Sequence, residues 1–407
     1  MSTIQVPTWI LAAAMMVAPG ASAADVVTEW NQKAGAAVLE AKVYPFAGTR
    51  ATALVHVAMF DAINSIEGRY SPYKVKISAP AGSSAEAAGV AAAHAVLVAI
   101  FPEQKASLDA SYAASLAQIP DASGKPSGIG VGEEVAGKIL ALRAADGADA
   151  PNTYRPTTAP GVYVPTIVPI ASQWGNVTPW VMERGAQFRP AAPPDLKSAE
   201  WARDYNEVKG LGGKKSTTRT AEQTEMARFW VITGPQSWDS VVQQLAGTQG
   251  RSLIQNARLF ALVEMAAADA YIAVFDAKYT FNFWRPITAI RNGDQDGNDA
   301  TIRDASWEPL IDTPPHPEYP CAHCITSSAV RAVLESEFGN ANVSLNMTSS
   351  AVPGVVHKWV SIEEWANEVS MARICGGIHY RNSTVVGQEM GKKIGELAVR
   401  NYLKPAR

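Results

Sequence analysis

Apolar residues recur every three or four positions along much of the chain, which is the spacing of one face of an α-helix. In residues 50–66, for example, Leu54, Val57 and Asp61 share a face on which Asp61 is the only charge. No alternating pattern long enough for a useful strand is found, and no internal repeat. The pattern predicts an all-α fold, with helices at about 25–43, 50–66, 84–101, 103–118, 197–208, 220–231, 251–278, 321–338, 361–375 and 384–402.

Proline density divides the chain into regions. Prolines are closely spaced from Pro151 to Pro194 and would break any regular element there. We therefore predict an N-terminal helical region at 24–150, a long irregular connection at 151–196 and a C-terminal helical region at 197–407. Connections of this length often carry function or cover a site.

The first 23 residues have the pattern of a secretory signal. They contain no charged side chain, run through the apolar stretch 9–17 and end in Ala21-Ser22-Ala23, the small-residue pattern of a cleavage site. The sequence thus predicts an exported protein, periplasmic or secreted, that begins at Ala24. The rest of the chain lacks the roughly 18 uninterrupted apolar residues that a membrane span requires.

The net charge and the distribution of basic residues indicate which classes of ligand the protein can bind. The chain carries 35 Lys and Arg against 38 Asp and Glu, a net charge of −3. Since no Lys/Arg-rich tract is interleaved with aromatic residues, a nucleic-acid partner is not expected, and we expect small-molecule substrates instead.

Three short segments carry candidate chemistry. In the first, Lys278 ends the apolar stripe of 251–278, and Pro286 favours an extended conformation at Arg285, so that both cations can turn inward. In the second, Pro320 precedes a helix whose first N–H groups can cradle an anion, with His323 at its rim.

In the third segment, Gly376 and Gly377 allow the chain to turn, so that Arg373 and His379 can face one point. Taken singly, each cation could be a solvated helix-end charge and each histidine a core residue. Taken together, the three segments supply what a tetrahedral oxyanion requires, which is positive charge, forked donors, a nucleophilic or ligating nitrogen and a proton shuttle.

In this order and spacing, the three segments resemble the signature shared by vanadium-dependent haloperoxidases and type-2 phosphatidic acid phosphatases. The segments 50–73 and 313–323 also resemble soluble bacterial haloperoxidase-like members. The resemblance implies a helical bundle of the haloperoxidase/acid phosphatase type. It also implies that His323 is the acid/base and that His379 is the axial ligand of vanadium or the nucleophile, while the oxyanion is bound by Lys278, Arg285, Cys321, Ala322 and Arg373.

The resemblance leaves three functions open. The first is a vanadate-dependent haloperoxidase that oxidises halide with hydrogen peroxide. The alternatives are an acid phosphatase that hydrolyses phosphate monoesters through a phosphohistidine, without a cofactor, and an inactive oxyanion-binding protein. Vanadate and phosphate have similar shape and charge, so the site residues do not separate the two chemistries.

Two positions depart from the family pattern. Cys321-Ala322 replaces the usual Ser-Gly, which exchanges a hydroxyl donor for an oxidisable thiol. Ser383 stands where the family commonly places an acid four residues after the ligand histidine, so the orientation of the His379 imidazole must come from Ser383 or from elsewhere.

The cysteines and two other patterns remain. Of Cys321, Cys324 and Cys375, we hypothesise a Cys324–Cys375 disulfide that ties two site helices together. A zinc cluster is disfavoured because no second Cys-x-x-Cys pair exists.

The acidic run 294–299 resembles a calcium-binding loop, but its glycine is not at the required position and the closing glutamate is absent. His56 is interpreted as a core residue.

Overall fold

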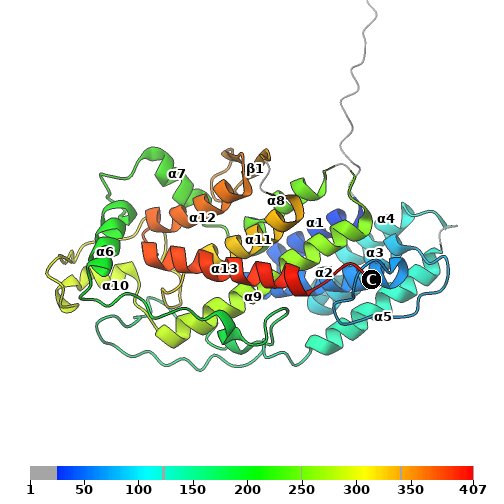
Figure 1. The fold of residues 1–407 in the computed structure, drawn as a ribbon, viewed down its shortest axis with the longest axis horizontal. Coiled ribbons are helices and arrows are strands. Elements are labelled where there is room, and N and C mark those ends of the chain that lie inside the picture. The colour runs from blue at the N-terminus through cyan, green and yellow to red at the C-terminus, as the bar shows by residue number, and fades with distance from the viewer. Residues whose placement is uncertain (1–24, 122–123, 249, 340–341, 407) are drawn as a thin grey trace, which may run out of the picture.

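The computed structural model describes residues 25–121, 124–248, 250–339 and 342–406, and these form an elongated helical molecule (Figure 1). The prediction of an all-α fold is confirmed, with one short hairpin as the exception among the described residues. The predicted signal segment, 1–23, lies outside them. In the part of the chain that is described, no helix has both the length and the apolarity to cross a membrane.

Five helices pack together in the N-terminal region, at the right of Figure 1. The second of them is almost entirely buried and contacts the first, third and fifth. The last of the five was not predicted individually, because its glycines have low helix propensity; packing against the third helix outweighs that preference. The helices are α1 (Val26–Ala41), α2 (Pro45–Glu67), α3 (Ala85–Ile100), α4 (Lys105–Ala117) and α5 (Lys125–Arg143).

An irregular connection then runs back along the molecule, with two short 3-10 turns at Trp174–Asn176 and Gly185–Phe188. The buried carboxylate of Asp269 accepts hydrogen bonds from the N–H groups of residues 180–182 at 2.7–2.8 Å. The connection is therefore fixed to the core rather than loosely attached to it.

The C-terminal region holds the remaining helices and a two-stranded antiparallel hairpin that the sequence did not predict, because each strand has only four residues. In the hairpin Leu345 lies opposite Trp359. The elements are α6 (Ala199–Gly212), α7 (Ala221–Phe229), α8 (Asp239–Ala246), α9 (Leu253–Phe281), α10 (Pro286–Arg291), α11 (Ala322–Phe338), β1 (Leu345–Thr348), β2 (Val356–Trp359), α12 (Ile362–Cys375) and α13 (Arg381–Asn401).

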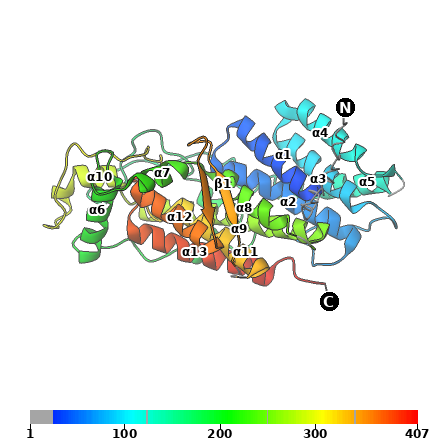
Figure 2. The same ribbon diagram turned by 90° about the horizontal axis from the view of Figure 1, so that it is seen from above.

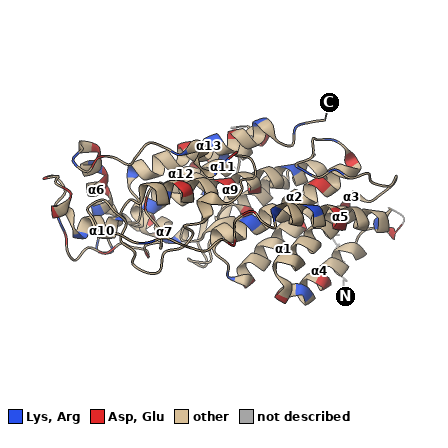
Figure 3. Ribbon diagram, turned by 90° about the horizontal axis from the view of Figure 1, so that it is seen from below, with Lys and Arg blue, Asp and Glu red and all other residues tan. Residues whose placement is uncertain are grey.

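Helix α9 joins the two regions, because it packs against α2 on one side and against α11 and α13 on the other (Figures 1 and 2). Helices α11 and α13 approach closely through glycine: a Cβ at Gly391 would lie 2.1 Å from the Ile325 carbonyl oxygen. Acidic and basic positions are interspersed along the helices (Figure 3), as the near-balanced composition suggests.

Candidate active site

The predicted site residues lie at or beside helix ends, and Ala322, His323, Arg373 and His379 among them line one cavity. Lys278 is in the last turn of α9, Arg373 in the last turn of α12 and His323 in the first turn of α11. Arg285 directly precedes α10 in an extended conformation (φ −80°, ψ 155°), as expected for a residue before proline. His379 follows a turn in which Gly377 has a φ of 79°, a value that suits glycine.

The cavity has a volume of about 590 Å³. Ala322, His323, Arg373 and His379 line its polar end, together with His316. Its other walls are mainly apolar and aromatic, and they include Tyr44, Phe46, Ile170, Val231, Tyr271, Phe275, Leu310 and Ile311.

Arg285 is fully buried and connects three segments of the site. Its Nε donates to the His316 carbonyl oxygen at 2.9 Å and its Nη1 to the Ile378 carbonyl oxygen at 2.8 Å. Its Nη1 also lies 3.3 Å from Nε2 of His379. Burial lowers the pKa of Arg285 to about 10, which leaves it charged at neutral pH.

Lys278 is also fully buried, and its Nζ donates to the carbonyl oxygens of Pro317 and Glu318 at 2.8 and 2.7 Å. An ammonium group has three donors, so these two bonds leave one for a ligand. Burial, and next the nearby Arg285, hold the pKa of Lys278 well below its usual range.

Arg373 is the least satisfied of the three cations. Its Nη1 donates to the Trp230 carbonyl oxygen, while its buried Nε has no hydrogen-bond partner among the described residues. Burial, followed by repulsion from Arg285, lowers its pKa to about 9. A buried donor without a partner is costly, and an anion in the cavity would supply the missing acceptor.

A carboxylate that the sequence did not indicate holds His379. Oε1 of Glu318 lies 2.7 Å from Nδ1 of His379 and also accepts the Tyr380 N–H at 3.1 Å. Oγ of Ser383 is farther from the same Nδ1, at 3.3 Å. The imidazole is therefore oriented mainly by Glu318, with Ser383 as a second contact.

The protonation states of this pair follow from their surroundings. Burial raises the pKa of Glu318 to about 7, although Lys278 and Arg285 act in the opposite direction. Burial and the three cations lower the pKa of His379 well below its usual range. His379 is therefore neutral, with its proton on Nδ1 facing Glu318 and the Nε2 lone pair facing Arg285.

The other two histidines also sit at the polar end as neutral rings. Nε2 of His323 lies 3.0 Å from the Ile232 carbonyl oxygen, so it carries the proton. Nδ1 of His316 lies 2.9 Å from Nη2 of Arg285, which can only donate, so this nitrogen is an acceptor. Burial lowers the pKa of both rings; the next cause is Arg373 for His323 and Lys278 for His316.

The cysteine pairing differs from the hypothesis of a Cys324–Cys375 bond. Cys321 and Cys324 form the disulfide, with Cα atoms 5.3 Å apart, and Cys375 is a free, buried thiol. The two partners face each other across the first turn of α11, where Cys321 is the N-cap. The expected thiol at Cys321 is thus absent, and the α11 N-terminus offers backbone N–H groups at Ala322 and His323.

Two other patterns have structural explanations. The carboxylate of Asp296 accepts bonds from Trp201 Nε1 and Thr301 Oγ1, so the acidic loop is an internally bonded turn. His56 is buried, stacks on Phe260 and bonds to Asn31. Among the described residues, no group of three His, Cys, Asp or Glu side chains is placed to hold a metal ion.

The donor set fits a tetrahedral oxyanion. Lys278, Arg285 and Arg373 are buried, only one buried carboxylate, Glu318, lies beside Lys278 and Arg285 among the described residues, and Nε of Arg373 lacks an acceptor there. The first N–H groups of α11 add further donors. A di- or trivalent anion would balance this excess positive charge, and it would offset the part of the lowering of the histidine pKa values that comes from the cations.

Comparisons with known proteins agree with this geometry. Residues 258–406 match the family model of the VCPO second helical-bundle domain. A stretch of 170 residues is 29% identical to vanadium chloroperoxidase of Curvularia inaequalis, covering 34% of this chain and 28% of that enzyme. The C-terminal region of the chain is thus similar in sequence to vanadium chloroperoxidases.

Two solved haloperoxidase structures share the whole fold. A bacterial vanadium-dependent iodoperoxidase superposes with a TM-score of 0.81 at 23% identity, covering 94% of this chain and 97% of that one. The holo form of a bacterial vanadium-dependent chloroperoxidase gives a TM-score of 0.73 at 16% identity, covering 94% and 93%. At these identities the likeness concerns the haloperoxidase fold and leaves the reaction open.

Neither Glu318 nor His316 was among the predicted site residues. Both lie in the run His316-Pro-Glu318 just before Pro320. The available signal was a histidine and an acid inside a proline-rich segment that leads directly into the predicted cradle.

Proposed function

We propose that the chain is a vanadate-dependent haloperoxidase-like enzyme that oxidises halide with hydrogen peroxide. The observation that carries the proposal is a neutral histidine, oriented by a buried carboxylate and surrounded by three buried cations, at the polar end of a large cavity. The match of residues 258–406 to the VCPO second helical-bundle domain and the likeness to the vanadium chloroperoxidase of Curvularia inaequalis support it.

In this proposal Lys278, Arg285, Arg373 and the α11 N-terminus would hold vanadate, and His379 would ligate it through Nε2. Bound vanadate supplies a Lewis acid that activates hydrogen peroxide towards attack by halide. The protein contributes fixed positive charge in a buried site, where electrostatic stabilisation is strongest.

Glu318 and His323 would control where protons are held and transferred in the site. Glu318 keeps the proton of His379 on Nδ1, so that Nε2, which lies beside Arg285, has a lone pair to offer an oxyanion. His323 donates its Nε2 proton to the Ile232 carbonyl, which leaves Nδ1 free to accept a proton from an incoming peroxide. Its lowered pKa keeps it in the basic form that this step requires.

A phosphatase is the second candidate, and the same histidine favours it. With its Nδ1 proton held by Glu318, His379 is suited to attack phosphorus through Nε2 while the bond to the leaving alcohol breaks. His323, once protonated, would give its proton to the leaving oxygen. Water would then hydrolyse the phosphohistidine, and no cofactor would be needed.

One side-by-side assay separates these functions. The purified chain is tested for bromide and iodide oxidation by peroxide, and for aryl-phosphate hydrolysis, each with and without vanadate. We expect vanadate-dependent halide oxidation that His379→Ala abolishes and that His94→Ala, a substitution in α3 at a residue that does not line the cavity, leaves intact. Phosphate hydrolysis inhibited by vanadate would replace the proposal with the phosphatase. Vanadate binding without either activity would indicate an oxyanion-binding protein.

A further inference from the structure

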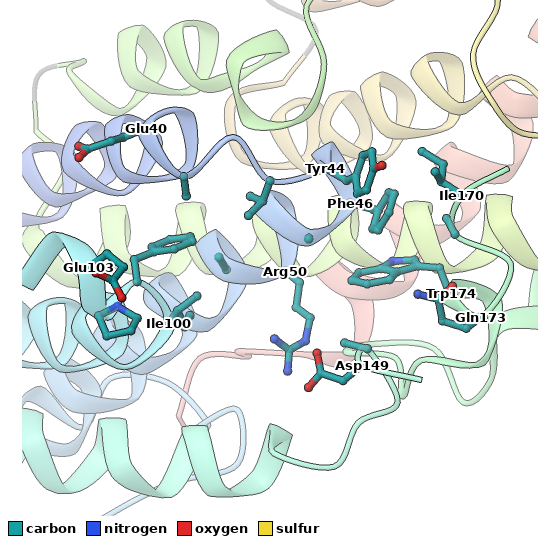
Figure 4. Close-up of a pocket in the computed structure, with 18 of the residues that line it drawn as sticks. Glu40, Tyr44, Phe46, Arg50, Ile100, Glu103, Asp149, Ile170, Gln173 and Trp174 are labelled. Carbon is teal, nitrogen blue, oxygen red and sulfur yellow. The ribbon is translucent and has the colours of Figure 1, made fainter. Parts of the chain in front are cut away.

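A second cavity of about 710 Å³ adjoins the active-site cavity (Figure 4). We call it the outer cavity; it lies between the start of α2, the link from α3 to α4 and the irregular connection. Figure 4 shows Tyr44, Phe46 and Trp174 at one end and Glu40 and Glu103 at the other. Both cavities have the size of ordinary small-molecule sites.

The two cavities share a wall made of Tyr44, Phe46 and Ile170. The rings of Tyr44 and Phe46 are stacked, with centroids 5.4 Å apart and planes 13° apart. Tyr44 is 54% exposed, so one face of its ring is open to a ligand. A flat aromatic molecule placed there would extend an existing stack.

A row of ring contacts leads from the outer cavity to the site. The ring centroids of Trp174 and Phe46 are 4.4 Å apart, and those of Phe46 and Phe275 are 5.3 Å apart. The ring centroids of Phe275 and His316 are also 5.3 Å apart. His316 in turn contacts Arg285. The shared wall is therefore aromatic on both sides, and its inner end reaches the residues that surround the oxyanion position.

Charge distinguishes the two cavities. The outer cavity has one basic lining residue, Arg50, whose guanidinium already bonds to the Asp146 carboxylate at 2.8 Å and to the Arg143 carbonyl at 3.1 Å. Its acidic lining residues are Glu40, Glu103 and Asp149. An anionic ligand would be repelled there, whereas a neutral or cationic one would not.

We propose that the outer cavity binds the organic acceptor of the oxidised halogen, and that this acceptor is an electron-rich aromatic molecule, neutral or cationic, stacked on Tyr44. The inference rests on the proposed halide oxidation for its chemistry. Hypohalous acid formed from halide and peroxide reacts at a ring carbon: the carbon–halogen bond forms, the C–H proton leaves, and hydroxide departs with that proton as water.

Binding can be tested without any turnover. Indole (neutral), tryptamine (cationic) and indole-3-acetate (anionic) are titrated into the protein by calorimetry, with no vanadate and no peroxide. We expect indole and tryptamine to bind at least about 5-fold more tightly than indole-3-acetate. Tyr44→Ala should weaken indole binding by about 3- to 10-fold, the range of one aromatic pair, and Tyr44→Phe should retain it.

Two further variants make the test specific. Ala47→Phe, which fills the outer cavity without removing an aromatic ring, should abolish binding. Ile302→Ala, a change at a 71% exposed residue elsewhere, should leave it unchanged. Indole binding that is absent, or equal in the wild type and in the Tyr44→Ala and Ala47→Phe variants, would overturn the inference. If halide is oxidised but indole does not bind, this inference fails; if indole binds but halide is not oxidised, the proposed function fails.

Discussion

Oε1 of Glu318 lies 2.7 Å from Nδ1 of His379, although the two residues are 61 positions apart in the chain. Both side chains are buried, and the same carboxylate oxygen accepts the Tyr380 N–H. Where the family commonly has an acid four residues after the histidine, this chain has Ser383 at 3.3 Å. The carboxylate has thus been supplied from the segment that precedes α11.

Replacing this carboxylate should weaken the site without removing the ligand histidine. We expect Glu318→Gln to reduce vanadate affinity by about 10- to 100-fold, the usual effect of losing a partner that orients a metal-binding histidine. Vanadate titration followed by ultraviolet absorbance measures it. Ser383→Ala is the matched control and should cost less than about 5-fold; an equal loss in both variants would show that Glu318 has no special part.

The same pair predicts a pH dependence. Burial raises the pKa of Glu318 to about 7, so the carboxyl group gains a proton as the pH falls through 7. It can then donate to Nδ1, which forces the imidazole proton onto Nε2 and blocks the ligand position. We expect vanadate affinity to decline below about pH 7 in the wild type, and this decline to be missing from Glu318→Gln. A decline of the same shape in both proteins would assign it to another group.

Arg373 should link anion binding to stability. Its unpartnered Nε gains an acceptor only when an oxyanion is present. Vanadate at 100 times its dissociation constant should stabilise the wild type by about 2.7 kcal/mol, measured as a rise in Tm. The rise should be mostly lost in Arg373→Met and kept in Arg331→Met, a change on the outer face of α11. A full rise in Arg373→Met would exclude Arg373 from the anion site.

Peptide mapping under non-reducing conditions should find Cys321 joined to Cys324 and Cys375 free. Breaking the bond with Cys321→Ser should loosen the first turn of α11, where Cys321 Sγ also accepts the Cys324 N–H at 3.2 Å. We expect faster amide exchange at the start of that helix, with the far end of α11 unchanged. A peptide containing Cys324 bonded to Cys375 would contradict the structure.

His56 should make the N-terminal region sensitive to acid. Burial lowers its pKa from 6.5 to about 3, so unfolding takes up a proton when the pH is below 6.5. Its contribution to stability is present above pH 6.5 and is lost as the pH falls, at up to about 1.4 kcal/mol per pH unit. His56→Gln keeps a donor for Asn31 and removes the titration. Denaturant unfolding at pH 5 and pH 8 should therefore show a smaller difference for the variant.

Most of the fold could be predicted from the sequence because apolar residues recur at regular helical spacing along the whole length of α2 and α9. Helix α5 and the β1–β2 hairpin were not, since glycine content hides the first and each strand of the second has only four residues. In both cases tertiary packing, rather than the local secondary-structure propensity of the residues, determines the conformation.

The site was partly readable for a similar reason. Arg285 could be paired with Lys278, and His379 with Arg373, because Pro286 and the two glycines before His379 show how the backbone turns. Glu318 could not be assigned to His379, because a contact across 61 residues leaves no periodic trace. The disulfide was misassigned because either partner of Cys324 was compatible with the sequence, and only the geometry of the first turn of α11 favours Cys321.

The wall between the two cavities comes from the start of α2 and from Ile170 of the irregular connection, while the predicted oxyanion residues lie between α9 and α13. On the proposed function, substitutions at Tyr44 or Phe46 would change which organic molecules fit without removing any of the groups proposed to hold the anion. In evolutionary terms, reaction and selectivity are encoded in separate stretches of the gene, so one can diverge while the other is kept.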